Sequence, residues 1–81
     1  MVYIKLSRNC WIDPESGDFV PGWFEAFLRR LHRDYPDAEL EIVDYGRCIT
    51  VRCGDAEQEA AIERDLQLLS IEAMFEWAGA R

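Results

Sequence analysis

AELEIVDYGRCITVRC, residues 38–53, contains two runs in which apolar and polar side chains alternate, as they do in half-buried β-strands. Gly46 separates the two runs and lies in a segment typical of a hairpin turn. In the second run, Ile49, Val51 and Cys53 share one face, because successive side chains of a strand point to opposite sides. The pattern predicts two antiparallel strands joined by a tight turn.

Helices are predicted on both sides of this strand pair. Between Pro21 and Pro36, apolar residues recur at the spacing of one helical face, and proline suits the first turn of a helix. After the strands, Asp55 and Gln58 have the spacing of a helix-capping pair. The helix that they start is expected to run to about Leu69, with alanines that favour helical structure.

The two ends of the chain add further elements. Residues 2–7, VYIKLS, alternate as a half-buried strand does. The segment 70–77, SIEAMFEW, fits either a strand or a continuation of the preceding helix. As a helix, it would place Leu68, Ile71 and Phe75 on a second apolar stripe that needs a partner of its own. We favour the strand.

The resulting order is β-α-β-β-α, followed by a last strand. This order resembles the ferredoxin-like fold, in which two helices pack on one face of an antiparallel sheet. The resemblance implies an α+β fold and covers the whole chain, residues 1–81, as a single domain. It is a pattern of elements without a sequence motif, and a fold alone assigns no function.

The chain has three cysteines, an odd number, and no two of them have the CxxC spacing. Cys48 and Cys53 fall on opposite faces of the predicted strand and are not expected to bond to each other. We predict three reduced thiols, with Cys53 in the core. Residues 1–6 lack the apolar region of a signal peptide, and no run has the roughly 18–20 apolar residues that span a bilayer. We expect a cytoplasmic protein.

The sequence carries no motif of a catalytic, cofactor or metal site. His32 is the only histidine, and no group of residues has metal-ligand spacing. The formal charge of −7 repels phosphates and argues against direct binding of nucleic acid. A dyad of Cys10 and His32 is the remaining enzymatic alternative, although nothing in the spacing brings the two together. We predict a protein that is not an enzyme and takes no cofactor.

Acidic residues concentrate in the second half of the chain. Residues 34–76 contain twelve carboxylates and three arginines, whereas residues 1–33 carry a net charge of +1. Such a field steers association with basic surfaces. The long connection 8–20 adds more carboxylates and a tryptophan, a residue type enriched at binding hot spots. The candidate partner-binding residues are Trp11, Asp13, Glu15, Asp18, Glu39, Glu41, Glu59, Glu63, Glu72 and Glu76.

In its small size, acidity and lack of catalytic motifs, the chain resembles the phage-encoded inhibitors of bacterial defence, above all the anti-CRISPR proteins. This resemblance implies an inhibitor that occupies a basic, nucleic-acid-binding surface of a protein partner, such as a CRISPR effector complex. It assigns no residue roles. The alternative is a small regulatory or ligand-sensing module of ferredoxin-like type that forms a homodimer through its sheet edges, near Tyr45. The sequence leaves monomer and homodimer both open.

Overall fold

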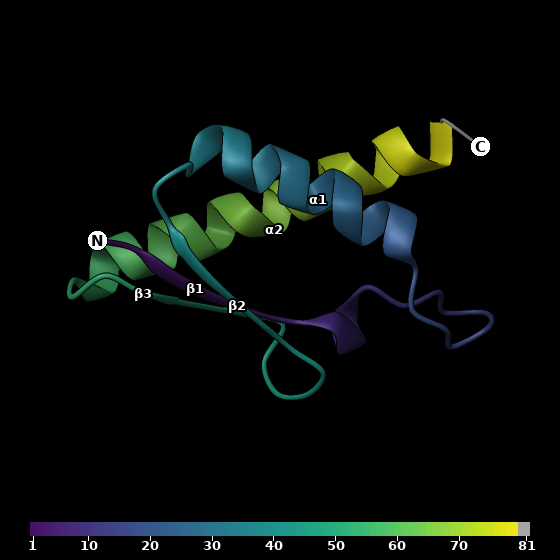
Figure 1. Ribbon diagram of the computed structural model, residues 1–81, viewed down its shortest axis with the longest axis horizontal. Helices are drawn as coiled ribbons and strands as arrows, with labels where there is room; N and C mark the ends of the chain where they lie inside the picture. The colour runs from purple at the N-terminus through teal and green to yellow at the C-terminus, as the bar shows by residue number, and fades with distance from the viewer. Residues whose placement is uncertain (80–81) are drawn as a thin grey trace.

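Two helices cover one face of a three-stranded sheet in the computed structural model, which describes residues 1–79 (Figure 1). The fold is α+β, as predicted. The elements in chain order are β1 (Tyr3–Ser7), the short 3-10 helix η1 (Arg8–Cys10), α1 (Pro21–Asp34), β2 (Glu39–Val43), β3 (Ile49–Arg52) and α2 (Ala56–Gly79).

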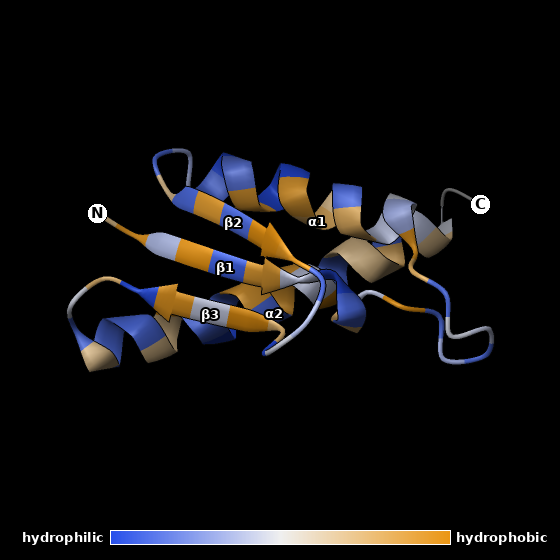
Figure 2. Cartoon of the chain, turned by 60° about the horizontal axis from the view of Figure 1, so that its bottom comes forward, coloured by the Kyte–Doolittle hydropathy of each residue, from blue (hydrophilic) through white to orange (hydrophobic). Residues whose placement is uncertain are grey.

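The sheet is mixed, with the strand order β2-β1-β3. β1 runs parallel to β2, with Tyr3 opposite Glu39, and antiparallel to β3, with Tyr3 opposite Arg52. Figure 2 shows β1 and β2 pointing the same way and β3 the opposite way. The predicted antiparallel sheet and the predicted hairpin between β2 and β3 are therefore wrong. Alternation tells which side chains share a face, but it does not tell which strands become neighbours.

The position of β1 explains this order. Its residues Ile4 and Leu6 are fully buried, so the strand is best placed in the centre of the sheet. The crossover through α1 returns β2 to its side in parallel orientation, as a helical connection does. β3 then takes the other side, where the N–H of Ser7 donates to the carbonyl of Cys48 at 3.0 Å. The sheet thus departs from the ferredoxin-like order, in which the parallel strands of the βαβ unit are split by another strand.

The segment 70–77 is helical and completes the 24-residue helix α2, so the strand that we favoured for it is wrong. The deciding contact is tertiary: Ile62, Leu66, Leu69 and Ala73 form one buried stripe that runs through both parts of the helix. The prediction of the start of α2 is confirmed. Asp55 Oδ1 accepts hydrogen bonds from the backbone N–H groups of Glu57 and Gln58, at 3.0 and 3.4 Å.

The core lies between the sheet and the two helices and includes aromatic rings from α1 and from the connection that precedes it. Phe24 and Phe27 of α1 each place a ring centroid 5.0 Å from that of Trp11. α1 and α2 approach closely at Gly22, where an added Cβ would lie 2.7 Å from the Trp77 ring. This contact requires glycine, and it positions the first turn of α1, and with it the end of the preceding connection, against α2.

Candidate functional site

The connection between β1 and α1 contains a compact loop, residues 12–19, whose backbone is closed by hydrogen bonds. We call it the acidic loop after its three carboxylates, Asp13, Glu15 and Asp18. The Asp13 N–H donates to the Asp18 carbonyl at 2.8 Å, and the Gly17 N–H donates to the Asp13 carbonyl at 2.7 Å. Gly17 has a φ of 74°, in the left-handed region that glycine adopts without steric cost. The loop is therefore ordered by its own main chain.

Trp11 anchors the start of the acidic loop in the core. Its side chain is only 2% exposed, and its ring packs against Trp23, Phe24 and Phe27. The Trp11 carbonyl also accepts a hydrogen bond from the N–H of Val20 at 2.8 Å, and this bond closes the base of the loop. Trp11 was predicted to contact a partner; in this fold it supports the loop from within and does not reach the surface.

A disulfide between Cys10 and Cys48 ties η1, two residues before the acidic loop, to the residue that precedes β3. Arg8 adds an ion pair to Asp44, with 2.7 Å between Nε and Oδ1. The two segments that these bonds join follow the carboxyl ends of β1 and β2. In sheets with parallel strands, ligands commonly bind at that end. The disulfide and the ion pair thus fix η1, the segment from which the acidic loop starts.

The prediction of three reduced thiols is wrong for Cys10 and Cys48, and Cys53 is the free cysteine of the described chain. The bonded pair is 38 residues apart in sequence and meets only because β3 lies beside β1. A disulfide-bonded Cys10 is not a free thiolate, and His32 lies in the last turn of α1, at the end of that helix remote from the loop. The structure therefore does not assemble the dyad that we considered.

The carboxylates of the acidic loop are not neutralised. Within the described residues, Asp13, Glu15 and Asp18 form no ion pair. The Asp13 carboxylate accepts the N–H of Glu15 at 2.9 Å, which shapes the turn without adding positive charge. The loop therefore presents three negative groups to the solvent.

Glu72 and Glu76, also predicted to bind a partner, are neutralised by arginines of α1. Glu76 accepts from Arg29 at 3.0 Å and from Arg30 at 3.2 Å, and Glu72 lies 3.7 Å from Arg30. We call these four residues the interhelical seam. The hydrogen bond from Arg29 and the nearby Arg30 charge lower the pKa of Glu76. The seam fastens α2 to α1, which leaves these carboxylates little charge to offer a partner.

A hydrogen bond also links α2 to the residue that follows α1. The Tyr35 hydroxyl donates to Asp65 at 2.6 Å. Partial burial, followed by this hydrogen bond and the Asp65 charge, raises the pKa of Tyr35 to about 12. Asp65 is thus engaged by the residue that follows α1.

Glu59 and Glu63 stand four residues apart on α2, a spacing at which like charges repel. The structure gives each a separate partner. Glu59 accepts the backbone N–H groups of Cys53 and Gly54 at 2.8 and 3.2 Å, and Glu63 pairs with Arg47 at 3.2 Å. Both carboxylates therefore have a structural explanation.

Glu39 and Glu41 lie on the face of the sheet that the helices leave open. By register, Glu39 is opposite Tyr3 and Glu41 is opposite Lys5. The Tyr3 hydroxyl donates to Glu41, and this hydrogen bond is the main reason why the pKa of Tyr3 is raised. Arg52 lies on the far side of Tyr3 on the same face, so positive and negative groups are interspersed there.

The ten predicted residues consequently do not form one acidic face. The acidic loop lies at one end of the longest axis, and the first turns of α2, with Glu59 and Glu63, lie at the other end (Figure 1). The interhelical seam lies between the helices, and the remaining pair lies on the open sheet. Of these groups, the acidic loop holds the most carboxylates that have no ion pair among residues 1–79.

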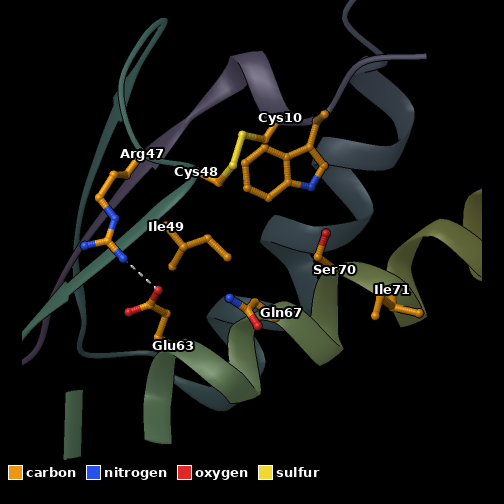
Figure 3. Close-up of a pocket in the computed structure, with 9 residues that line it drawn as sticks. Cys10, Arg47, Cys48, Ile49, Glu63, Gln67, Ser70 and Ile71 are labelled. Carbon is orange, nitrogen blue, oxygen red and sulfur yellow. Dashed lines mark hydrogen bonds and ion pairs between the residues drawn. A yellow bond between two sulfur atoms is a disulfide. The ribbon is translucent and has the colours of Figure 1, made fainter. Parts of the chain in front are cut away.

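Sequence reasoning missed a pocket of about 550 Å³ beside the disulfide (Figure 3). Gln67, Ser70 and Ile71 contribute one wall from α2, and the Arg47–Glu63 ion pair lies at one side. Its other lining residues are Cys10, Trp11, Cys48 and Ile49. The Trp11 Nε1 is buried without a hydrogen-bond partner among residues 1–79. Only the tertiary structure brings these segments together, so no local motif marks the pocket.

No group of histidine, cysteine or carboxylate side chains in the described part of the chain could hold a metal ion. Within the same residues, no helix is long and apolar enough to cross a membrane. The cytoplasmic location stays a prediction, and the disulfide is a feature more common in oxidising compartments.

Comparison with known proteins gives no relative: no family model, no curated protein and no solved structure matches this chain. The function is therefore argued from the residues of the site.

Proposed function

We propose that this chain is a non-enzymatic inhibitor that places its acidic loop on a basic, nucleic-acid-binding surface of a protein partner, in the manner of anti-CRISPR proteins. The proposal depends on one observation: three carboxylates that form no ion pair with residues 1–79 stand on a loop that is already ordered. A carboxylate can accept two parallel hydrogen bonds from one arginine guanidinium. Such charge-assisted hydrogen bonds are stronger than hydrogen bonds between neutral groups. Arginines and lysines so occupied are no longer available to phosphates.

The composition of the loop suits an interface. Ile12 and Phe19, which pair at its base, remain 38% and 37% exposed. Together they offer an apolar centre beside the charged tip, and interfaces commonly combine an apolar core with a polar rim. The Trp11 anchor and the disulfide keep the loop in one conformation, so little conformational entropy is lost on binding.

The net charge of −7 supports the same mechanism at long range. An acidic protein is steered towards a basic groove, which raises the association rate at low salt. Salt screens this attraction over about 8–10 Å at physiological ionic strength. Inhibition should therefore weaken as the salt concentration rises.

The test measures binding of target DNA by purified CRISPR effector complexes, using a gel mobility shift with and without the protein. The variant Glu15→Lys/Asp18→Lys reverses two loop charges whose carboxylates form no ion pair or hydrogen bond within the described structure. The matched control, Asp37→Lys/Glu57→Lys, makes the same change in net charge at two exposed carboxylates remote from the loop, which also form no ion pair with the described residues. We expect the wild type and the control to block DNA binding, and the loop variant to need at least about tenfold more protein.

Two outcomes would overturn the proposal. One is that DNA binding by every effector type in the panel is unchanged at saturating protein. The other is that the loop variant and the control inhibit equally well, since inhibition would then depend on net charge or on another surface. Circular dichroism of both variants shows that neither result comes from unfolding.

A further inference from the structure

α2 has a second apolar face, opposite the one that packs in the core. Leu68, Ile71 and Phe75 are 60%, 49% and 68% exposed, although each is a large apolar residue. With the exposed Ala78, one turn further on, they form what we call the outer stripe. Contiguous exposed apolar side chains on a small protein commonly mark an interaction site. Ile71 also lines the pocket beside the disulfide, and the stripe is otherwise open to the solvent among the described residues.

The spacing of the outer stripe is that of a helix-pairing seam. Its members follow one another at intervals of three, four and three residues, which is the repeat by which two helices interlock their side chains. The face that packs in the core is separate and is made by Ile62, Leu66, Leu69 and Ala73. α2 therefore satisfies the core with one face and presents a seam for a further helix with the other.

The charges beside the outer stripe indicate which molecule supplies the helix that pairs with it. Asp65 is bonded to Tyr35, and Glu72 and Glu76 are paired with arginines of α1. A basic partner would need carboxylates without bonding partners, and these three all have one. Two copies of a protein with a charge of −7 repel each other except where a surface is locally neutralised. On this side of α2, Glu72 and Glu76 are neutralised in this way and Arg64 adds a positive charge, so the negative charge is low there.

We propose that the outer stripe is the contact between two copies of this chain, whose α2 helices pair in antiparallel orientation. In this arrangement Ile71 of each copy packs against Phe75 of the second copy, and Leu68 packs against Ala78 of the second copy. Large and small side chains then face each other along the seam, which favours close packing.

Arg64, one turn before Leu68, selects the antiparallel orientation. Parallel helices would place the two Arg64 side chains side by side, and like charges repel. Antiparallel helices place each Arg64 beside the carboxyl end of the other α2. The antiparallel arrangement therefore keeps the two Arg64 charges apart.

The α2 contact differs from the sheet-edge homodimer that the sequence led us to consider, which would use Tyr45 and the exposed strand β2. It is also independent of the acidic loop, which belongs to the connection between β1 and α1. Each copy of the dimer would still carry its loop at the end of the molecule.

The test is sedimentation equilibrium over about a hundredfold range of protein concentration, because dimerisation follows mass action. The stripe variant is Ile71→Ser/Phe75→Ser. The control is Ile42→Ser/Tyr45→Ser, which removes two exposed apolar side chains at the sheet edge instead. We expect dimers for the wild type and the control, and at least about a tenfold larger dissociation constant for the stripe variant.

A wild type that stays monomeric over the whole range would overturn the α2 dimer. So would a control that loses the dimer while the stripe variant keeps it. The DNA-binding assay of the acidic loop is a separate readout, so failure of the dimer and failure of the inhibitor proposal are distinguishable.

Cross-linking tests the orientation. On a Cys53→Ser background, the single variants Ile71→Cys and Phe75→Cys are mixed and oxidised with a mild reagent. Antiparallel pairing predicts that the mixed disulfide between positions 71 and 75 forms faster than either symmetric one. Faster formation of the symmetric disulfide at position 71 would overturn the proposed orientation.

Discussion

The acidic loop and the interhelical seam contain the same kind of side chain in opposite electrostatic situations. Glu72 and Glu76 of the seam lie within 3.7 Å of arginine nitrogens, whereas Glu15 and Asp18 of the loop have no cation among the described residues. The first pair holds two helices together, and the second faces the solvent. Carboxylates that look alike in sequence are therefore divided by the fold into structural and available groups.

The difference shows why formal charge is a poor guide to a binding face. Residues 34–76 have the excess of carboxylates, yet several of these serve as caps, hydrogen-bond acceptors or ion-pair partners within the fold. The loop lies in the half of the chain that is nearly neutral by count. Its charge is available because no cation in the described part of the chain forms an ion pair with it.

The largest effect is expected at the anchor of the acidic loop. Replacement of Trp11 by alanine removes a buried ring that contacts Phe24 and Phe27, and should lower the free energy of unfolding by about 3–5 kcal/mol. Urea unfolding followed by circular dichroism measures this change. Trp11→Phe is the control and should lose less, because it keeps a ring in the core. A loss below about 1 kcal/mol for Trp11→Ala would show that the loop is not held from the core.

The next effect concerns the disulfide. Cys10→Ser/Cys48→Ser removes a link across 38 residues and should cost about 2–5 kcal/mol of unfolding free energy. Amide hydrogen exchange should rise first in the acidic loop, and the seam should keep its protection. Cys53→Ser, at the free and half-buried cysteine, serves as the control and should change stability by less than about 1 kcal/mol. An equal loss of hydrogen-exchange protection in the acidic loop and the interhelical seam would show that the disulfide does not act mainly on the loop.

The smallest effect is a pH dependence of the stability, which comes from the ion pairs of the interhelical seam. The pKa of Glu76 is lowered in the folded protein, so its ion pairs add stability above its ordinary value of 4.5 and lose it as the pH falls through the folded pKa. The thermal midpoint of the wild type should therefore decrease on acidification more than that of Glu76→Gln. Glu15→Gln should follow the wild type. Identical curves for wild type and Glu76→Gln would show that the seam does not contribute in solution.

Much of the local structure could be predicted from the sequence. The first strand, α1, the capped start of α2 and two strands in the stretch 38–53 were all predicted within a few positions. Each of these depends on a short-range rule, such as side-chain alternation, the fixed φ of proline or a carboxylate that accepts a hydrogen bond from the following N–H groups.

The errors all concern interactions between distant segments. Segment 70–77 fits both periodicities, and the buried stripe of α2 settles it as helix. The pairing of β2 and β3 with β1, the bond of Cys10 to Cys48 and the burial of Trp11 likewise depend on which segments meet. None of these contacts leaves a signal in local spacing.

The amino-acid order by itself determined where most of the helices and strands form, which side chains share a face and how much charge the molecule carries. These properties follow from backbone geometry and side-chain chemistry within a few residues. The tertiary structure alone decided which carboxylates meet an arginine, which are left to the solvent in the acidic loop, and which apolar residues of α2 stay uncovered. Ion pairing and burial act over a few ångströms in space, and the fold brings residues that are tens of positions apart to that distance.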